Sequence, residues 1–341
     1  TTGKPKIAGY TRNDLDMWGE CVARSLTMAG ADKDSIVHVS YGYGLFTGGL
    51  GAHIGAETIG ATVIPMSSGN TQKQVMFLQD MKSTHLCCTP SYALTIAEAV
   101  AKAGIKPEEL ALKAGVFGAE PWTQAMRDKI EAGLGIKAHD IYGLSEIMGP
   151  GVSTSCSENN GMHIQEDYFY PEIIDPDTLE PVPDGEKGEL VITTLGKEGM
   201  PLIRYRTRDI CYLMREKCAC GRTTVRMSRV FGRTDDMLII RGVNVFPSQV
   251  ETVIAKFDKE LTMNYKLYIG RENNTDTFEL AVELAEGLAL DDIGFVEMMR
   301  GRVEHALRDI LGIGCKVRLL NEGTLPRSEG KAVRVEDTRK L

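Results

Sequence analysis

The first four residues of the chain, Thr1, Thr2, Gly3 and Lys4, have the chemistry of a phosphate-binding loop. Glycine lets backbone N–H groups approach phosphate oxygens, hydroxyl groups add donors, and a lysine adds positive charge. A Walker loop continues its Gly-Lys pair with Ser or Thr as a magnesium ligand. Pro5 stands there instead, which removes a donor and favours an extended Lys4. The segment is therefore either a phosphate loop of another class, whose magnesium ligand lies elsewhere, or a solvated surface turn.

A second set of residues has the chemistry of a metal site. Cys218 and Cys220 form a C-x-C pair, and Cys156 and His163 lie in an earlier glycine-containing loop. Three thiolates and one imidazole suit tetrahedral zinc, although one intervening residue is tighter than the usual two to four. We expect a structural zinc with no open position, which pins a small β subdomain to the loop after Glu146. Unligated thiols are the alternative.

The elements that position these residues alternate in the first part of the chain. A helix is predicted over residues 14–29, with Asn13 or Asp14 as its N-cap, after one short strand over residues 6–11. Short apolar runs separated by amphipathic segments follow. The runs lie at residues 35–40, 61–66, 84–90 and 137–143, and the segments at 71–81 and 91–103. This alternation predicts a parallel sheet with helices on both faces.

The pattern changes near residue 160, where prolines and a Gly-containing turn at 184–185 separate short extended runs. The runs at residues 188–195 and 210–216 predict antiparallel strands in a small β subdomain. After residue 237 the order changes again. Its elements are a strand, a helix over 247–257, two strands, a long helix over 291–311 and a last strand over 315–320. This order predicts a separate α+β domain.

Composition and charge exclude several classes of protein. The 341 residues exceed one typical domain, so we expect a large domain and a smaller one. No apolar run approaches the ~18 residues of a membrane span, and nothing near residue 1 resembles a targeting segment. The formal charge of -8 argues against sequence-independent binding to nucleic acid or anionic lipid. Eight cysteines, several in apolar stretches, indicate free thiols in a reducing cytoplasm.

Five motifs occur in order along the chain. They are TTGKP at 1–5, IYGLSE at 141–146, YRTRD at 205–209, GRTDD at 232–236 and PRSEGK at 326–331. In this order they resemble the motifs of the adenylate-forming superfamily, which includes acyl-CoA synthetases, peptide-synthetase adenylation domains and luciferases. The sequence between them is similar to one branch, the phenylacetate-coenzyme A ligases. Members of this branch carry further residues upstream, so we expect the chain to be a fragment or a trimmed form.

The resemblance implies ATP-dependent ligation of an aryl acetic acid, phenylacetate before others, to coenzyme A through an acyl-adenylate, with release of AMP and pyrophosphate. It implies an α/β N-terminal adenylation core over residues 1–232, with parallel sheets flanked by helices and a small β subdomain. A hinge over residues 233–236, on Asp235, would lead to a smaller, mobile α+β domain over residues 237–341. ATP, magnesium and coenzyme A are the implied cofactors. A homodimer is left open.

The resemblance assigns catalytic roles to two residues. Lys331 would bridge the acyl carboxylate and the α-phosphate. Glu146, after a predicted strand where ligands collect in open α/β sheets, would hold magnesium. By composition alone, Lys331 is a surface lysine and Glu146 a helix-start carboxylate.

The resemblance also assigns a nucleotide-binding set. Besides the phosphate loop, it comprises Ala119, Glu120, Pro121, Asp140, Tyr142, Asp209 and Arg233. Asp209 would accept both ribose hydroxyls, which suits an acceptor-only carboxylate; an aspartate paired with neighbouring arginines is the alternative. Arg208 replaces a glycine of the family motif, which leaves the local loop geometry open.

Aromatic and small residues suggest a slot for the acid. By resemblance, Tyr41, Phe46, Ala52 and Ile141 would surround an aromatic ring, and such walls fit an aryl acid better than a long acyl chain. A core-packing loop is the alternative. Three rival functions remain: an adenylation enzyme for another aryl acid or a carrier protein, a luciferase-like oxidoreductase, and a non-catalytic aryl-acid binding protein. The presence of both catalytic residues argues against the last.

Overall fold

The computed structural model describes residues 7–44, 46–234, 238–241, 243–272, 275–327 and 333–339. The chain divides into two compact units. The first comprises Thr1–Glu120 and Arg127–Val230, and the second comprises Pro121–Met126 and Phe231–Leu341. A larger unit with a parallel sheet and a smaller α+β unit confirm the predicted fold class. The predicted boundaries at residues 232 and 237, and the mobility of the second unit, stay predictions.

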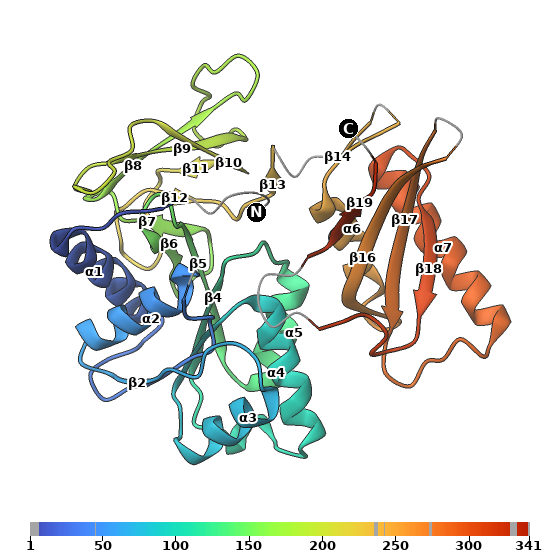
Figure 1. Ribbon diagram of the computed structural model, residues 1–341, viewed down its shortest axis with the longest axis horizontal. Helices are drawn as coiled ribbons and strands as arrows, with labels where there is room; N and C mark the ends of the chain where they lie inside the picture. The colour runs from blue at the N-terminus through green and yellow to red at the C-terminus, as the bar shows by residue number, and fades with distance from the viewer. Residues whose placement is uncertain are drawn as a thin grey trace. The chain divides into compact units, whose positions relative to one another are not determined.

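Within the described residues, a nine-stranded sheet forms the centre of the first unit (Figure 1). Its order is β11 (Leu213–Met214), β12 (Arg226–Met227), β7 (Met162–Ile164), β6 (Gly149–Ser155), β5 (Lys137–Leu144), β4 (Ala114–Gly118), β3 (His85–Cys88), β1 (Ile36–Val39) and β2 (Thr62–Ile64). The strands from β5 to β2 pair in parallel. Strands β5, β3, β1 and β2 lie where the sequence predicted strands, whereas β4 was not predicted. The strands from β6 to β11 extend the sheet in antiparallel fashion.

Helices cover both faces of this sheet (Figure 1). They are α1 (Arg12–Met28), α2 (Thr47–Thr58), α3 (Thr71–Asp80), α4 (Pro90–Lys102) and α5 (Gln124–Leu134), with a short 3-10 turn η1 (Pro107–Glu109). The alternation along β1 shows how the faces are used. Val37 and Val39 join the core cluster with Trp18 of α1, whereas His38 Nε2 lies 2.6 Å from Oε1 of Gln74 on α3.

The start of the described chain differs from the prediction. Residues 7–11 form no strand, and α1 begins earlier than expected because Thr11 is its N-cap. The Thr11 hydroxyl accepts from the Asp14 backbone N–H, and the Asp14 carboxylate accepts from the Thr11 backbone N–H over 2.9 Å. Asp14 thus completes a capping box from inside the helix and is not the cap itself.

A smaller antiparallel sheet forms the predicted β subdomain. Strand β9 (Gly188–Thr194) pairs with β8 (Phe169–Ile174) on one side and β10 (Tyr205–Cys211) on the other. The apolar run over residues 210–216 does not form one strand. It breaks at Tyr212, so that β10 stays in the small sheet while β11 joins the large one.

The second unit contains its own sheet. The elements of the second unit are β13 (Gly232–Arg233), β14 (Leu238–Ile240), β15 (Val243–Val245), α6 (Pro247–Ile254), η2 (Ala255–Phe257), β16 (Leu261–Glu272), β17 (Thr275–Leu284), α7 (Ile293–Leu311), β18 (Lys316–Leu320) and β19 (Val335–Asp337). Four of the strands pair in the order β18-β17-β16-β19. Buried residues recur along α7 at helical spacing, from Met299 through Val303 and Leu307 to Leu311. This apolar stripe is the amphipathic pattern that predicted the helix.

Candidate active site and metal centre

Some predicted site residues lie outside the part of the chain that the structure describes. These are the phosphate-loop residues, the hinge residue and the catalytic lysine: Thr1, Thr2, Gly3, Lys4, Asp235 and Lys331. Among the other nucleotide residues, Pro121 and Arg233 belong to the second unit and the rest belong to the first. The roles assigned to all of these residues stay predictions.

Two predicted nucleotide residues from different sheets meet in a short hydrogen bond. The Tyr142 hydroxyl on β5 donates to Oδ2 of Asp209 on β10 over 2.6 Å. Burial, together with the Asp209 carboxylate, raises the pKa of Tyr142 well above its usual range, so the phenol remains a donor at neutral pH. Asp209 is 5% exposed, and the backbone N–H of Asp140 donates to the Ser155 hydroxyl nearby on β6. The structure therefore fixes an acceptor carboxylate beside the end of β5.

The chain turns sharply where β4 ends. Gly118 pairs with Ile141 of β5, and a Cβ at Gly118 would lie 2.1 Å from the Ile141 carbonyl oxygen, so only glycine permits this approach. Ala119 follows with a φ of 73°, which is uncommon outside glycine. Oε1 of Glu120 accepts from the Ser91 backbone N–H over 2.6 Å. Strained backbone of this kind concentrates at binding segments, which supports the predicted adenine-lining role.

Arg208 has a backbone conformation that favours glycine. Its φ is 69°, in the left-handed region, and the pairing of β9 with β10 shifts register between Arg206 and Ile210. The buried carboxylate of Glu189 accepts from the Arg208 backbone N–H over 3.2 Å and from Arg206 Nη2 over 2.5 Å. Glu189 therefore stabilises the bulge before Asp209 from the neighbouring strand.

The four predicted aryl-site residues come together in the first unit. Tyr41, Ala52 and Ile141 are buried in one hydrophobic cluster. The ring centroids of Tyr41 and Phe46 lie 6.0 Å apart, and Phe46 is 37% exposed at the N-terminus of α2. Burial raises the pKa of Tyr41 well above its usual range, so its ring presents a neutral wall. The arrangement joins apolar surfaces from a loop, a helix and a strand.

Glu146 lies in the turn that follows β5. The side chains of Ser145 and Glu146 are exposed, and the backbone N–H groups of Ile147 and Met148 donate to the Leu144 carbonyl oxygen. The carboxylate thus stands on a closed turn at the carboxyl end of a parallel strand. This is the edge of an open α/β sheet where ligands bind, and a carboxylate there suits magnesium.

Two residues beneath this turn were missed by sequence reasoning. The Lys197 ammonium donates to the Glu146 carbonyl oxygen over 3.1 Å and lies 4.8 Å from the centroid of the Tyr10 ring. The Tyr10 hydroxyl donates to the Ser145 carbonyl oxygen over 3.1 Å. Burial lowers the pKa of Lys197, while the Asp14 and Glu146 carboxylates oppose that shift. A single lysine between glycine and glutamate matches no motif, so only the structure reveals it.

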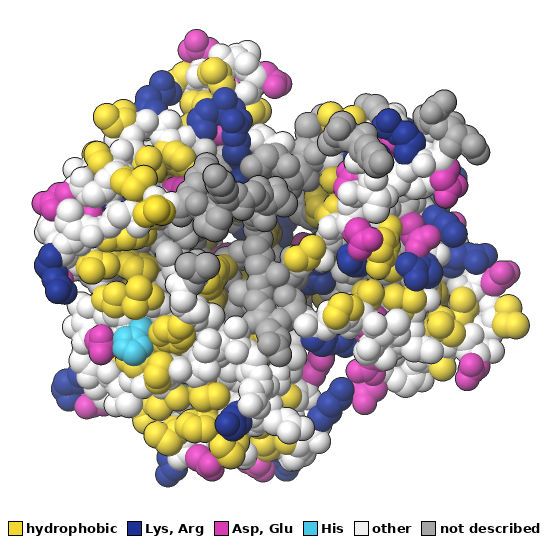
Figure 2. Space-filling view, in the orientation of Figure 1, with side chains coloured by type: hydrophobic (Ala, Val, Ile, Leu, Met, Phe, Trp, Pro, Cys, Tyr) yellow, Lys and Arg dark blue, Asp and Glu magenta, His cyan; other side chains and the backbone are white. Residues whose placement is uncertain are grey.

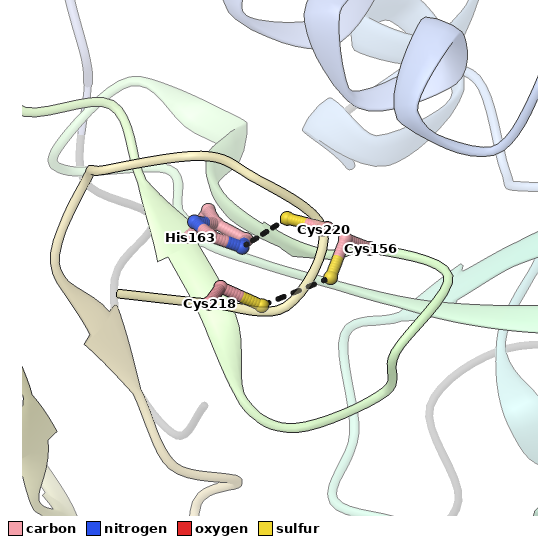
Figure 3. A group of neighbouring side chains, drawn as sticks. All are labelled: Cys156, His163, Cys218 and Cys220. Atoms are coloured by element: carbon pink, nitrogen blue, oxygen red, sulfur yellow. Dashed lines mark hydrogen bonds between the residues drawn. The ribbon is translucent and has the colours of Figure 1, made fainter. Parts of the chain in front are cut away.

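The predicted metal ligands form one cluster (Figure 3). The candidate ligand atoms of Cys156, His163, Cys218 and Cys220 all lie within 4.8 Å of one another. The sulfurs of Cys156 and Cys218 are 3.7 Å apart, and Cys220 Sγ lies 3.4 Å from His163 Nε2. Ligands on one tetrahedral zinc would lie about 3.8 Å apart for two sulfurs and about 3.5 Å apart for sulfur and nitrogen. The donor set and its spacing therefore fit zinc.

A further residue orients the histidine of this cluster. His163 Nδ1 lies 3.0 Å from the Thr224 hydroxyl, which leaves Nε2 directed at Cys220. Such support for the second ring nitrogen is typical of metal-binding histidines. Thr224 carries no sequence signal of its own. Cys156 lies in the loop between β6 and β7, His163 lies on β7, and Cys218 and Cys220 lie in the loop between β11 and β12. A bound ion would therefore cross-link the edge of the large sheet. This differs from the expected pinning of the small β subdomain.

Charged side chains of both signs lie on the described surface. On the face that Figure 2 shows, the described Lys and Arg side chains are interspersed with Asp and Glu and form no continuous basic stripe. Among the described helices, none has the length and apolar character needed to cross a membrane. All eight cysteines are free thiols.

Comparison with known proteins gives consistent relatives. The sequence model of the AMP-binding enzyme family matches residues 1–196, and that of the AMP-binding enzyme C-terminal domain matches residues 242–339. The chain is 52% identical to a phenylacetate-coenzyme A ligase of Thermus thermophilus, covering 100% of this chain and 79% of that one. It is 51% identical to the phenylacetate-coenzyme A ligase of Escherichia coli, covering 100% of this chain and 78% of that one.

A solved structure agrees with these relatives. It is 2-hydroxyisobutyryl-CoA ligase in the postadenylation state in complex with 2-HIB-AMP, and it is 30% identical with a TM-score of 0.92. The match covers 99% of this chain and 73% of that one. The family motifs, the fold and these relatives agree: the chain belongs to the AMP-binding enzyme family, among the phenylacetate-coenzyme A ligases.

Proposed function

We propose that this protein ligates an aryl acetic acid, phenylacetate first, to coenzyme A at the expense of ATP. The acid would form an acyl-adenylate with release of pyrophosphate, and the coenzyme A thiol would then displace AMP as a thioester forms. The observation that carries the proposal is the Asp209 carboxylate, held by Tyr142 on the same strand that leads to Glu146. The names of the curated relatives support the reaction class.

The residues of the first unit would position the nucleotide. Asp209 would accept hydrogen bonds from the ribose hydroxyls, since one of its oxygens already accepts from Tyr142 and a carboxylate has further lone pairs. The strained segment at Ala119 and Glu120 would lie against the adenine, with Asp140 at its edge. Holding the reactants in line for attack on the α-phosphate supplies much of the rate enhancement in such reactions.

The acid would lie against Tyr41, Phe46, Ala52 and Ile141. The buried members are apolar or neutral, so they favour an aromatic ring over a charged or hydrated group. A long acyl chain would need a continuous channel, and these four residues do not by themselves indicate one. Phenylacetate is therefore the first substrate to test, and other aryl acids are the comparison set.

Magnesium would be held by Glu146, whose exposed carboxylate stands on the turn after β5. A magnesium ion bound there would neutralise charge on the phosphates. The phosphate loop at residues 1–4 and Arg233 would add contacts to the phosphates and the ribose.

A structural zinc ion would be held by Cys156, His163, Cys218 and Cys220, for which the distances of the cluster are the support. Four protein ligands leave no open position, so the ion would stabilise the fold and take no part in catalysis. Free thiols throughout the chain support a cytoplasmic location. A homodimer is left open.

The second unit would act as a lid. We place its hinge at residues 233–236, on Asp235, between a core over residues 1–232 and a mobile domain over residues 237–341. Lys331 would bridge the acyl carboxylate and the α-phosphate during adenylation only, and the lid would then rotate for thioester formation.

The half-reactions test this assignment. Lys331→Ala is expected to lower ATP–pyrophosphate exchange by about 100-fold or more, as loss of a charge-stabilising group does. Thioester formation from supplied phenylacetyl-adenylate should stay within about threefold of the parent rate. A threefold change in rate corresponds to a smaller free energy than the loss of one ordinary hydrogen bond. Lys316→Ala, on the exposed end of β18, is the matched control. Equal loss of both half-reactions in Lys331→Ala would refute the assigned role.

The nature of the thiol acceptor separates the chief rival. A carrier-protein-loading enzyme shares the adenylation step, so pyrophosphate exchange does not distinguish the two. Supplying coenzyme A and a holo carrier protein in parallel does. Thioester on coenzyme A supports the proposal, and thioester on the carrier protein alone contradicts it.

A further inference from the structure

Two neighbouring carbonyl groups of the turn after β5 accept hydrogen bonds from side chains that are distant in sequence. Tyr10 donates to the carbonyl oxygen of Ser145, and Lys197 donates to that of Glu146, each over 3.1 Å. The side chains of Ser145 and Glu146 remain exposed. The backbone of the turn is thus fixed at two consecutive peptide groups, while the Glu146 carboxylate is directed to solvent.

The Lys197 side chain occupies an unusual environment for a lysine. The residue is 5% exposed, and its ammonium contacts the Glu146 carbonyl oxygen and the face of the Tyr10 ring. Lysines are rarely buried without a carboxylate in direct contact. The hydrogen bond from a charged donor is stronger than one between neutral groups, and the aromatic face adds cation–π attraction. A surface lysine placed by chance would make neither contact.

The segment that carries Lys197 is itself anchored. The buried Asp14 carboxylate accepts from the backbone N–H groups of Glu198 and Gly199, each over 2.8 Å. The Thr11 hydroxyl donates to Oε2 of Glu198 over 2.8 Å. The loop around Lys197 is therefore attached to the first turn of α1. This attachment fixes the position of the Lys197 ammonium next to the Glu146 carbonyl group.

Tyr10 is anchored in the same way from the other side. Its ring stacks on Trp18 of α1, with centroids 5.4 Å apart and an interplanar angle of 24°. The indole Nε1 of Trp18 donates to the Pro150 carbonyl oxygen over 3.0 Å. In the sequence, Tyr10 lies six residues after Lys4 and directly before Thr11, the N-cap of α1. One helix terminus thus supports both contacts to the turn.

We propose that Lys197 and Tyr10 are positioning residues that hold the Glu146 turn in the geometry needed to bind the magnesium of MgATP. The inference rests on the proposed role of Glu146. Neither residue contacts a reacting atom in this account; each acts through the backbone of the turn.

The test measures the magnesium dependence of ATP–pyrophosphate exchange in Lys197→Met, Lys197→Arg and Tyr10→Phe. Loss of an outer-sphere support typically costs about 10- to 100-fold in metal affinity. Lys197→Met should therefore raise the magnesium concentration for half-maximal exchange about tenfold, with kcat at saturating magnesium within about threefold of the parent. Lys197→Arg keeps the charge and a donor and should recover most of the loss. Tyr10→Phe removes one hydrogen bond and should shift the half-maximal concentration about fivefold.

Two readouts separate positioning from a general structural role. Thioester formation from supplied phenylacetyl-adenylate involves no triphosphate, so it should stay near the parent rate in all three variants. Lys73→Met makes the same change on an exposed residue of α3 and should leave the magnesium dependence unaltered. If Lys197→Met does not fold, Tyr10→Phe decides the question through the same magnesium titration.

Unaltered magnesium dependence in folded Lys197→Met, or in folded Tyr10→Phe, would overturn the clamp. So would equal loss of both half-reactions in the folded Lys197 and Tyr10 variants. Failure of the proposed function looks different, because the parent protein itself would then form no aryl thioester with coenzyme A.

Discussion

The phenol oxygen of Tyr142 lies 2.6 Å from Oδ2 of Asp209, and this contact joins the large parallel sheet to the small antiparallel one. Both residues were predicted to bind the nucleotide, one on the strand before the magnesium-binding turn and one in a motif that departs from its family. The bond holds the carboxylate by a donor that stays protonated at neutral pH. This hydrogen bond therefore orients the Asp209 carboxylate within the first unit, where we propose that it binds the nucleotide.

Removing this donor should weaken nucleotide binding. Tyr142→Phe leaves the buried Asp209 carboxylate with one hydrogen bond fewer, a loss of about 1.5 kcal/mol or more for a charged acceptor. In pyrophosphate exchange, the KM for ATP should rise about tenfold and the KM for phenylacetate should change less than twofold. The control is Tyr170→Phe, which should change neither KM, because Tyr170 on β8 is 54% exposed. A larger effect on the KM for phenylacetate than on that for ATP would contradict the assigned contact.

The bulge at Arg208 predicts which substitutions are tolerated. Arg208→Gly suits the φ of 69° and should change the free energy of unfolding by less than about 1 kcal/mol. Arg208→Val places a β-branched side chain in the left-handed region and should cost about 1–3 kcal/mol. Urea denaturation measures both. If glycine were the more damaging of the two, the side-chain contact of Arg208 with Glu189, at 3.9 Å, would outweigh backbone conformation.

The buried Asp14 carboxylate should make stability depend on pH. Burial favours its neutral form, but hydrogen bonds from the backbone N–H groups of Thr11, Glu198 and Gly199 outweigh that effect and lower the pKa of Asp14. A lowered folded-state pKa contributes stability above the unfolded pKa of about 3.9, and that contribution is lost as the pH falls through the folded value.

Asp14→Asn tests this sign. It should cost about 1–3 kcal/mol in the free energy of unfolding at pH 7, because an amide cannot accept all three hydrogen bonds. The difference between the parent and Asp14→Asn should narrow as the pH falls below about 4. Asp16→Asn, on an exposed residue of the same helix turn, is the control. A difference that widens on acidification would show that the carboxylate does not stabilise the fold in its charged form.

The Cys/His cluster predicts metal content. Elemental analysis by inductively coupled plasma mass spectrometry should find one zinc ion per chain in the purified protein and none in Cys218→Ser. Removing zinc with a chelator should lower the free energy of unfolding by about 4 kcal/mol, the linkage expected for a ligand at a thousand times its Kd. Cys315→Ala, in the second unit, should keep its zinc. Zinc-free parent protein of unaltered stability would leave the cluster as free thiols.

Periodicity and motif spacing predicted much of this molecule for physical reasons. The parallel strands β1, β2, β3 and β5 were visible as short apolar runs, such as residues 84–90 around β3, which is buried throughout. Strand β4 was not predicted, although it is buried throughout as well. The helix α7 was visible through its apolar stripe. The strand over residues 6–11 was wrong because a short apolar segment does not by itself say whether a partner strand exists. Tyr212 breaks the run over residues 210–216 for a similar reason, since the choice of sheet is a tertiary one.

The site divides in the same way. Residues that we propose to bind a ligand carry motifs, and so Tyr142, Asp209 and Glu146 could be named from the sequence. Residues that act through the backbone carry none. Lys197 and Tyr10 reach carbonyl groups, and any residue presents a carbonyl group, so no pattern of side chains records the contact.

Product analysis tests the central claim most directly. The protein is incubated with phenylacetate, ATP, magnesium and coenzyme A, and the products are identified by mass spectrometry. We expect the protein to form phenylacetyl-coenzyme A and AMP in equal amounts, together with pyrophosphate. No thioester should form when either phenylacetate or coenzyme A is omitted. Formation of ADP in place of AMP, or failure to form a thioester from any aryl acid tested, would contradict it.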